Sequence, residues 1–143
     1  MDPRDRDLAH RRARDGEVIR EFRSSIRSDR RAPVNLLLIH TVGAKSGVPR
    51  VTPLTCALSR EGWLVAAAKA GSARNPGWYH NAVAHPDLTV EVAGEGAVPV
   101  RAVELHGRAR DLAWRRLLEV NPRLRGYARR TTRSIPVLRL MRR

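Results

Sequence analysis

Two strands joined by a glycine-bracketed loop, spanning residues 34–55, constrain the fold more than any other feature of this chain. Residues 34–39 are apolar with one exception, and a β-rich run resumes at Arg50 after the loop Gly43–Gly47. Short apolar runs bounded by glycine and proline are typical of buried strands. The loop presents backbone N–H groups beside Lys45 and Arg50, so it is a candidate anion site. The bare spacing fits an ordinary strand–loop–strand turn equally well.

The rest of the chain predicts a mainly β protein with flanking helices. Three- and four-residue periodicity and turn residues predict helices at 15–26, 77–85, 109–120 and 122–130, and strands at 34–40, 50–58, 63–68, 88–93, 98–105 and 135–140. We expect residues 1–14 to be frayed and 28–33 to be a linker. Because hairpin-length connections dominate, an antiparallel sheet closed into a small barrel is favoured, with its first three strands in a meander. The expected division is a charged N-terminal segment with a short amphipathic helix, 1–32, and a barrel domain, 33–143.

The net charge of +14 is unevenly distributed. Residues 108–143 contain twelve arginines and two acidic residues, whereas residues 32–107 are nearly neutral. Nucleic acid, an anionic membrane surface or a polyanionic ligand would be attracted to such a segment, and a solvated arginine-rich surface is the alternative. Of the 28 basic residues only Lys45 and Lys69 are lysines, and both follow apolar runs in glycine-containing loops. A compact ammonium group in such a loop suits phosphate binding.

The segment 69–81, KAGSARNPGWYHN, is a second unusual stretch. Asn75 and Pro76 have the character of a helix cap and a first-turn proline. Trp78 at the start of that helix is expected in the core, as aromatic side chains usually are. The alternative is that the helix N-terminus faces an anion or a ring system.

Motifs for several kinds of chemistry are absent from the sequence. Neither a P-loop nor a G-x-G-x-x-G turn precedes a helix, and no G-x-S-x-G, Cys–His signature or pair of loop carboxylates is present. His80 and His85 lack the spacing and carboxylate neighbours of a zinc site, so no metal is expected. The lone Cys56 is expected to be a buried hydrophobe, which is compatible with a reducing cytoplasm. An enzyme built this way needs a cofactor to carry its chemistry.

Four ordered motifs between residues 33 and 140 resemble those of a known family. They read LLLIHTVGAKSGVPRVTPL, AAKAGSARNPGWYHN, HPDLTVEV and TTRSIPVLRL. In this order they are similar to the deazaflavin-dependent nitroreductase family of actinobacterial proteins. The resemblance implies a split antiparallel β-barrel related to the FMN-binding pyridoxamine-phosphate-oxidase fold. It also implies coenzyme F420, an 8-hydroxy-5-deazaflavin with a phosphodiester and an oligoglutamate tail.

The resemblance carries site residues over position by position. Those that match the phosphate-binding loop and a second basic position are Lys45, Ser46, Gly47, Arg50 and Lys69. Those that it implies around the deazaflavin are Pro53, Ala68, Gly71, Asn75, Pro76, Trp78, Tyr79 and Asn81. Tyr127 resembles an aromatic residue that closes over the substrate side, and it is the candidate catalytic proton source. Ala44 and Ala68 depart from the arginine and serine usual in the family.

We therefore expect a cytoplasmic oxidoreductase that passes a hydride from reduced coenzyme F420 to a hydrophobic acceptor such as a quinone, a nitro compound or an unsaturated conjugated compound. An FMN-binding protein of the same fold and a non-catalytic F420-binding protein are the alternatives. A basic nucleic-acid-binding protein is a more distant one, because aromatic residues make up only 4% of the chain and leave few stacking platforms. The basic C-terminal segment is a candidate for peripheral membrane contact, and the chain is expected as a monomer or a homodimer.

Overall fold

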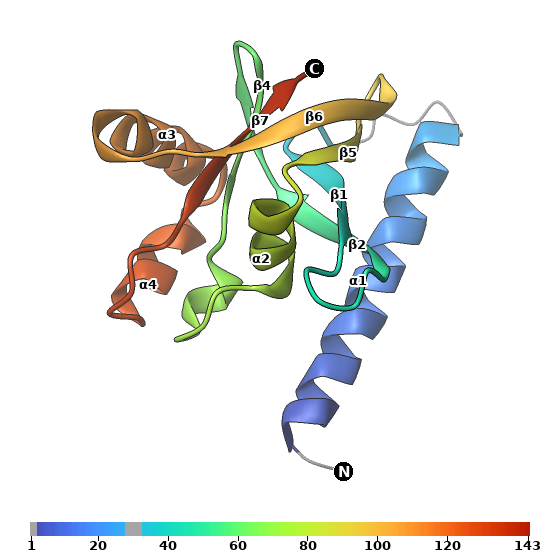
Figure 1. The fold of residues 1–143 in the computed structure, drawn as a ribbon, viewed down its shortest axis with the longest axis horizontal. Coiled ribbons are helices and arrows are strands. Elements are labelled where there is room, and N and C mark those ends of the chain that lie inside the picture. The colour runs from blue at the N-terminus through green and yellow to red at the C-terminus, as the bar shows by residue number, and fades with distance from the viewer. Residues whose placement is uncertain (1–2, 28–32) are drawn as a thin grey trace.

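The computed structural model describes residues 3–27 and 33–143, which form a long helix and a curled sheet flanked by shorter helices (Figure 1). The helices are α1 (Pro3–Arg27), α2 (Gly77–Ala84), α3 (Gly107–Val120) and α4 (Arg123–Arg129), with a 3-10 turn, η1, at Lys69–Gly71. The strands are β1 (Leu36–Val42), β2 (Pro49–Thr55), β3 (Ala57–Ser59), β4 (Gly62–Ala66), β5 (Asp87–Val92), β6 (Gly96–Glu104) and β7 (Val137–Arg142).

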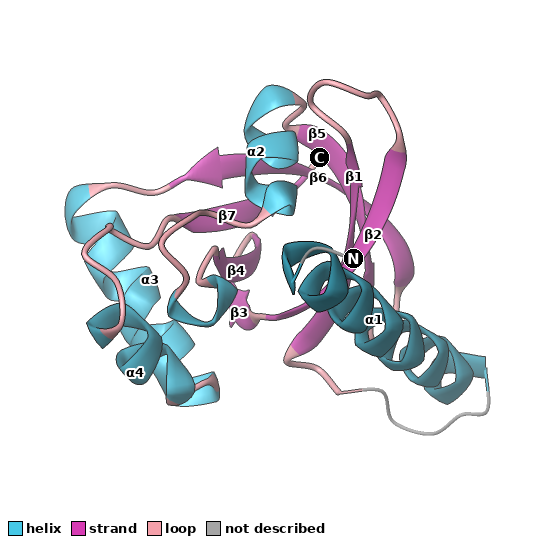
Figure 2. Cartoon of the chain, turned by 90° about the horizontal axis from the view of Figure 1, so that it is seen from below, coloured by secondary structure: helices cyan, strands magenta, loops and turns pink. Residues whose placement is uncertain are grey.

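The seven strands form one antiparallel sheet in the order β2-β1-β5-β6-β7-β4-β3. The sheet curls, and its two edge strands, β2 and β3, are consecutive in the chain (Figure 2). The expected split antiparallel β-barrel with flanking helices is confirmed. The expected meander is wrong, because the predicted strand 50–58 divides at Cys56 and β4 pairs with β7 rather than with β2.

The concave side of the sheet holds the main core. In each strand alternate residues point inward, as the two-residue period of a pleated strand requires. The inward set packs with α2 and comprises Leu37, Ile39, Cys56, Trp63, Val65, Ala67, Trp78, Ala82, Leu88, Val90, Val92, Val98, Val100, Leu138 and Leu140. Cys56 and Trp78 therefore lie in the core, as expected. Burial raises the pKa of the Cys56 thiol to about 12, so this cysteine is unreactive at neutral pH.

A second core joins α3 and α4 to the other face of β4 and β7. Leu64 and Val137 alternate with residues of the main core and face the helices, where Leu117 and Leu124 meet them. The predicted helices 109–120 and 122–130 are thus confirmed within a few residues of their ends. Their apolar sides are buried here, which leaves most of their arginines exposed.

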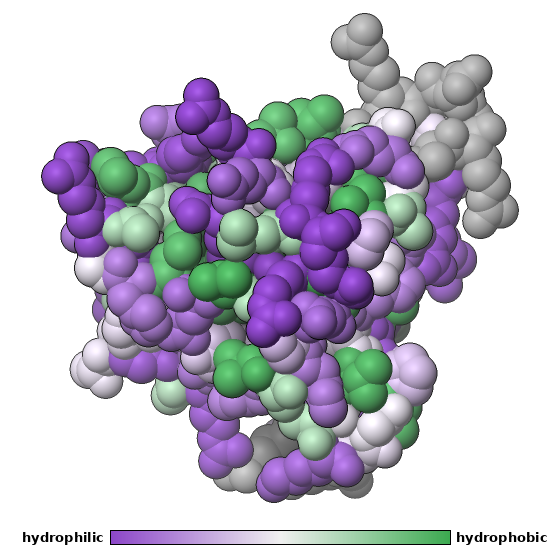
Figure 3. Space-filling view, turned by 45° about the horizontal axis from the view of Figure 1, so that its top comes forward, coloured by the Kyte–Doolittle hydropathy of each residue, from purple (hydrophilic) through white to green (hydrophobic). Residues whose placement is uncertain are grey.

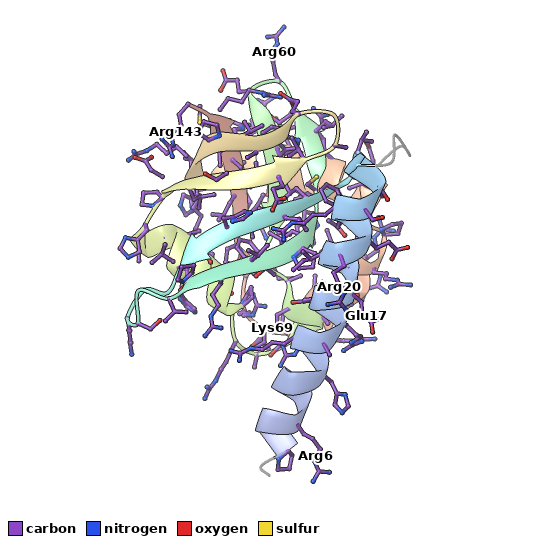
Figure 4. All side chains as sticks on the ribbon, turned by 90° about the vertical axis from the view of Figure 1, so that its right-hand side faces the viewer. Arg6, Glu17, Arg20, Arg60, Lys69 and Arg143 are labelled. Atoms are coloured by element: carbon purple, nitrogen blue, oxygen red, sulfur yellow. The ribbon has the colours of Figure 1, made fainter. Side chains whose placement is uncertain are left out.

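Helix α1 lies outside the barrel, against the strands at the β2 edge (Figures 2 and 4). Phe22 is its buried anchor, with 2% of the residue exposed. Arg23 donates two hydrogen bonds to the carboxylate of Glu91 on β5, at 3.0 and 2.7 Å, and His40 Nε2 of β1 lies 2.6 Å from the same carboxylate. The hydrogen bond from Arg23 lowers the pKa of Glu91.

The N-terminal helix is longer than the sequence predicts. It begins at Pro3, so the expectation of frayed residues 1–14 is wrong for the part that is described. Residues 3–14 carry almost no apolar periodicity, but proline suits the first helical position and arginine and alanine are good helix formers. The predicted linker lies outside the described residues except for Pro33.

The face seen in Figure 3 is largely hydrophilic, with apolar residues in separate small groups. Among residues 3–27 and 33–143, no helix is both long and apolar enough to cross a membrane.

Candidate functional site

Two neighbouring cavities follow the edge strand β2. The first, of about 560 Å³, is lined by residues 49–52 of that strand, and the second, of about 230 Å³, by residues 53–55. Lys69 of η1 lines both. We call the two cavities together the β2 groove, with a cationic half and an apolar half for the reasons given next.

The cationic half lies between α1 on one side and the start of α2 on the other. Four basic side chains line it: Arg11 and Arg12 of α1, Arg50 of β2 and Lys69. The one carboxylate in its lining is Asp15, whose pKa is raised by burial. Its remaining walls come from Gly16, Ile19, Thr41, Pro49, Val51, Thr52, Pro76, Gly77, Trp78 and Asn81.

The apolar half has no charged residue other than Lys69. Pro53, Leu54 and Thr55 form its β2 side, and α3 and α4 close the opposite side. Its other lining residues are Ala66, Ala68, Ala70, Leu117, Asn121, Leu124 and Tyr127. Tyr127 carries the phenolic hydroxyl that lines this half.

The turn that carries Lys69 has an uncommon backbone. Lys69, Ala70 and Gly71 have φ values of 46°, 51° and 80°, all in the left-handed region. For lysine and alanine this conformation costs about 1–3 kcal/mol each, so surrounding contacts must hold it. The turn places Lys69 in the lining of both halves of the groove.

Arg133 supplies much of that restraint. Its guanidinium donates to the carbonyl oxygens of Ala67, Ala68 and Ser72 at 3.2, 2.8 and 2.9 Å, and to Asn75 Oδ1 at 2.7 Å. Asn75 therefore binds Arg133 rather than capping α2, whose N-cap is Pro76 without a side-chain hydrogen bond. The predicted cap is wrong, because the guanidinium fork offers this amide oxygen a charged donor.

Gly71 joins the lysine turn to α4. A Cβ at this position would lie 2.7 Å from the Tyr127 carbonyl oxygen and 2.9 Å from Arg130 Cβ. Gly71 is buried and lines neither half of the groove, so its part is to let the turn and the Tyr127 helix meet. The elements that carry Lys69 and Tyr127, η1 and α4, therefore pack directly against each other.

The loop with Lys45 sits at the far end of β2. Lys45, Ser46 and Gly47 line neither half of the groove. Asn81 of α2 ties the loop down, since its Oδ1 accepts from the Ala44 N–H at 3.0 Å and its Nδ2 donates to Thr41 Oγ1 at 3.2 Å. Ser46 Oγ accepts from the Val48 N–H at 3.2 Å. The Lys45 ammonium is exposed on this loop, beyond the cationic half.

Two aromatic residues of α2 have different positions. Trp78 is buried in the core, as expected, and it also lines the cationic half. Tyr79 lines neither half, and its hydroxyl donates to the Glu104 carboxylate. That hydrogen bond raises the pKa of Tyr79 to about 12.

Sequence reasoning missed the contribution of α1 to the groove. Arg11 and Arg12 lie where the helix has no apolar stripe, so in the sequence they look like solvated surface. It also missed Arg133, since one arginine among twelve in a basic segment has no distinguishing signal. Lys69 is different, because its rarity marks it, and the structure places it at the centre of the groove.

The cationic half has an excess of positive charge, because four basic side chains share its lining with the one carboxylate of Asp15. The pKa of Lys69 is lowered, first by burial and then by the charges of Arg11, Arg74 and Arg133. Within the described ranges no three His, Cys, Asp or Glu side chains gather as metal ligands would. The groove therefore suits an organic anion with an apolar part.

Comparisons with known proteins agree on one family. The family model of F420H(2)-dependent quinone reductases matches residues 10–141. An F420H(2)-dependent quinone reductase of Mycobacterium tuberculosis is 42% identical over 114 residues, which cover 78% of this chain and 76% of the relative.

Solved structures give the same result. A structure of an F420-H2 dependent reductase is 33% identical, with a TM-score of 0.68 over 74% of this chain and 93% of that chain. A chain described as a domain-swapped dimer is 34% identical, with a TM-score of 0.68 over 74% of this chain and 79% of its own. The resemblance to deazaflavin-dependent reductases is confirmed. This chain therefore belongs to the F420H(2)-dependent quinone reductase family, and it is an F420H2-dependent reductase with coenzyme F420 as its hydride donor.

Proposed function

We propose that reduced coenzyme F420 lies along β2, with its phosphate held by Arg50 and Lys69 and its ring over Ala68, and that a quinone is reduced beside Tyr127. The observation that carries this placement is the charge polarity of the β2 groove. One half gathers four basic side chains, and the other has apolar walls with one charged residue between them. The coenzyme has the same division, with a flat ring at one end and phosphate and carboxylates at the other.

The reduced coenzyme supplies a hydride, and a quinone that gains this hydride and one proton becomes the hydroquinone. The chain has to hold donor and acceptor close together away from water, which its apolar half does with alanine and leucine side chains. The proton is the part that a side chain can supply, and Tyr127 is the hydroxyl that lines this half. Lys69, between the halves, places a positive charge where the anionic arm meets the ring.

The other residues expected at the site take supporting roles in this proposal. Asn75 and Gly71 hold the lysine turn, and Asn81 holds the loop of Lys45, Ser46 and Gly47. Pro53, Pro76 and Trp78 shape the walls. Tyr79 fixes α2 through Glu104 without reaching the groove.

The proposal is tested by binding and turnover of two variants. Coenzyme binding should quench Trp78 fluorescence, and this quenching measures the Kd. Lys69→Ala should raise the Kd of the coenzyme about tenfold, because the substitution removes a half-buried cation from the anion site. Tyr127→Phe should leave the coenzyme Kd unchanged and lower kcat with a quinone about tenfold or more. Equal turnover of Tyr127→Phe and the parent protein would remove Tyr127 from proton transfer.

Binding without any oxidation of the coenzyme would favour a carrier, and preferential binding of FMN would favour the FMN alternative.

We also propose that the basic segment 108–143 meets an anionic membrane surface, where hydrophobic quinones dissolve. Support comes from twelve arginines against two acidic residues, with Arg123, Arg125 and Arg129 of α4 and the following Arg130 all exposed. A homodimer is the assembly that the solved relative described as domain-swapped suggests for this chain.

A further inference from the structure

We propose that Arg11 and Arg12 of α1 form a binding site for the oligoglutamate tail of coenzyme F420. The inference rests on the function proposed above and adds a third wall to that site. It assigns a role to a helix whose basic residues otherwise look like plain solvated surface. Figure 4 shows Lys69 beside α1, beyond the β2 edge, whereas Arg6 projects from the free end of the helix.

The position of α1 is the first argument. The helix stands on the opposite side of the cationic half from α2, and both arginines line that half together with Arg50 and Lys69. Arg11 is close enough to Lys69 to be among the charges that lower the pKa of that lysine. A ligand whose phosphate lies between Arg50 and Lys69 would therefore pass α1 as it leaves the groove.

The charge balance is the second argument. Among the side chains that the structure describes, no salt bridge includes Arg11, Arg12, Arg50 or Lys69, and Asp15 is the one carboxylate beside them in the lining. By comparison, Arg23 pairs with Glu91 and Arg142 with Glu95. Four basic side chains around one carboxylate leave an excess of positive charge, and a polyanion that enters between them compensates it.

The rigidity of the helix is the third argument. Phe22 and the Arg23–Glu91–His40 cluster fix α1 on the sheet, so the two arginines project from a held backbone rather than from a loose end. Less ordering is then needed when a ligand binds.

Arg11 and Arg12 suit the carboxylates of the glutamate tail better than the phosphate of the coenzyme. Arg11 and Arg12 are exposed, and adjacent positions on a helix point about 100° apart, so they cannot enclose one compact phosphate. They can take separate carboxylates of a flexible chain, and guanidinium groups match carboxylates well. The expected gain is modest for exposed pairs, about three- to tenfold in affinity.

The experiment compares two forms of the coenzyme by tryptophan quenching at low salt: the form without glutamates and the form with a long glutamate tail. In the parent protein the long-tailed form should bind about three- to tenfold more tightly. The double variant Arg11→Ala with Arg12→Ala should bind both forms with about the same Kd. Alanine is a better helix former than arginine, so α1 should persist, and circular dichroism checks this.

The matched control is Arg6→Ala with Arg14→Ala, which removes two exposed arginines from the same helix outside the groove. It should keep the preference for the long tail. If the control loses the preference as much as the test variant, the effect is one of overall charge and the inference is wrong. Equal binding of both forms by the parent protein also overturns it, while the proposed function stands. Failure of the parent protein to bind either form would instead overturn the proposed function.

Discussion

Gly71 determines how the Lys69 turn packs against the Tyr127 helix. Its φ of +80° is readily adopted only by glycine, and its missing side chain lets η1 touch the Tyr127 backbone. The residue contacts neither half of the groove directly, yet it sets how far Tyr127 lies from Lys69. Gly71 matters because it has no Cβ, which would lie 2.7 Å from the Tyr127 carbonyl oxygen.

Gly71→Ala should destabilise the fold by about 2–3 kcal/mol, because the methyl group would meet backbone atoms of α4 in a strained conformation. Urea unfolding measures the change. Gly77→Ala is the control, since a Cβ there meets nothing within 4 Å and the first turn of a helix tolerates alanine. A loss below about 0.5 kcal/mol for Gly71→Ala would mean that α4 moves freely from the turn.

At the scale of elements, the attachment of α1 decides whether the cationic half keeps its outer wall. Two strands and a helix meet in one cluster there, since Glu91 of β5 accepts hydrogen bonds from Arg23 of α1 and faces His40 of β1. Glu91 is the shared acceptor, and its side chain is only 17% exposed.

Glu91→Gln should therefore cost about 1–2 kcal/mol at pH 7, through the lost charge-assisted hydrogen bonds. The pKa of Glu91 is lowered in the folded state by Arg23, so its contribution is present above the unfolded value of about 4.3 and disappears as the pH falls through the lower folded value. Thermal unfolding of both proteins between pH 7 and pH 3 should show the difference shrinking only below about pH 4.3.

Glu95→Gln is the control for this change. Glu95 also pairs with an arginine, Arg142, but both side chains are nearly half exposed, so the variant should differ from the parent protein by less than about 0.5 kcal/mol. A difference for Glu91→Gln that stays constant down to pH 3 would show that packing rather than charge causes it.

Elements that depend on local pattern could be predicted from the sequence, and those that depend on distant pairing could not. The strand–loop–strand unit at 34–55 and helix α3 show clear periodicity, and the structure has both. The partner of β4 could not be predicted, because β7 lies more than 70 residues further along the chain. The residues of the groove show the same difference. Lys69 could be predicted because lysine is rare in this chain, whereas Arg11 and Arg12 line the groove only because α1 packs against β2.

At the scale of the whole molecule, α3 and α4 together carry seven arginines and two acidic residues, and they lie on one side of the barrel (Figure 1). Their apolar sides are buried against β4 and β7, so the exposed arginines face outward together. A charged face of this kind attracts anionic surfaces over about a Debye length and weakly beyond it.

The protein should therefore sediment with anionic vesicles and not with neutral ones, and about 0.5 M salt should release it. Arg123→Ala with Arg125→Ala should weaken vesicle binding roughly thirtyfold, at about 1 kcal/mol for each arginine at the surface. Arg60→Ala, on the turn between β3 and β4, is the control and should have little effect. Equal binding to neutral vesicles would contradict the proposed membrane contact.

The two prolines of β2 have a consequence for inhibitor design. Pro49 and Pro53 pair with Val42 and Leu38 of β1 and are four residues apart, so both lack their N–H group on the same, outward side of this edge strand. An extended peptide laid against that edge would find donors missing at two positions and could not complete a hydrogen-bonded ladder. A flat heteroaromatic acid needs no such ladder, because it can use stacking, shape and the nearby cations. Compound searches against this enzyme are therefore better directed at planar anions than at strand-mimicking peptides.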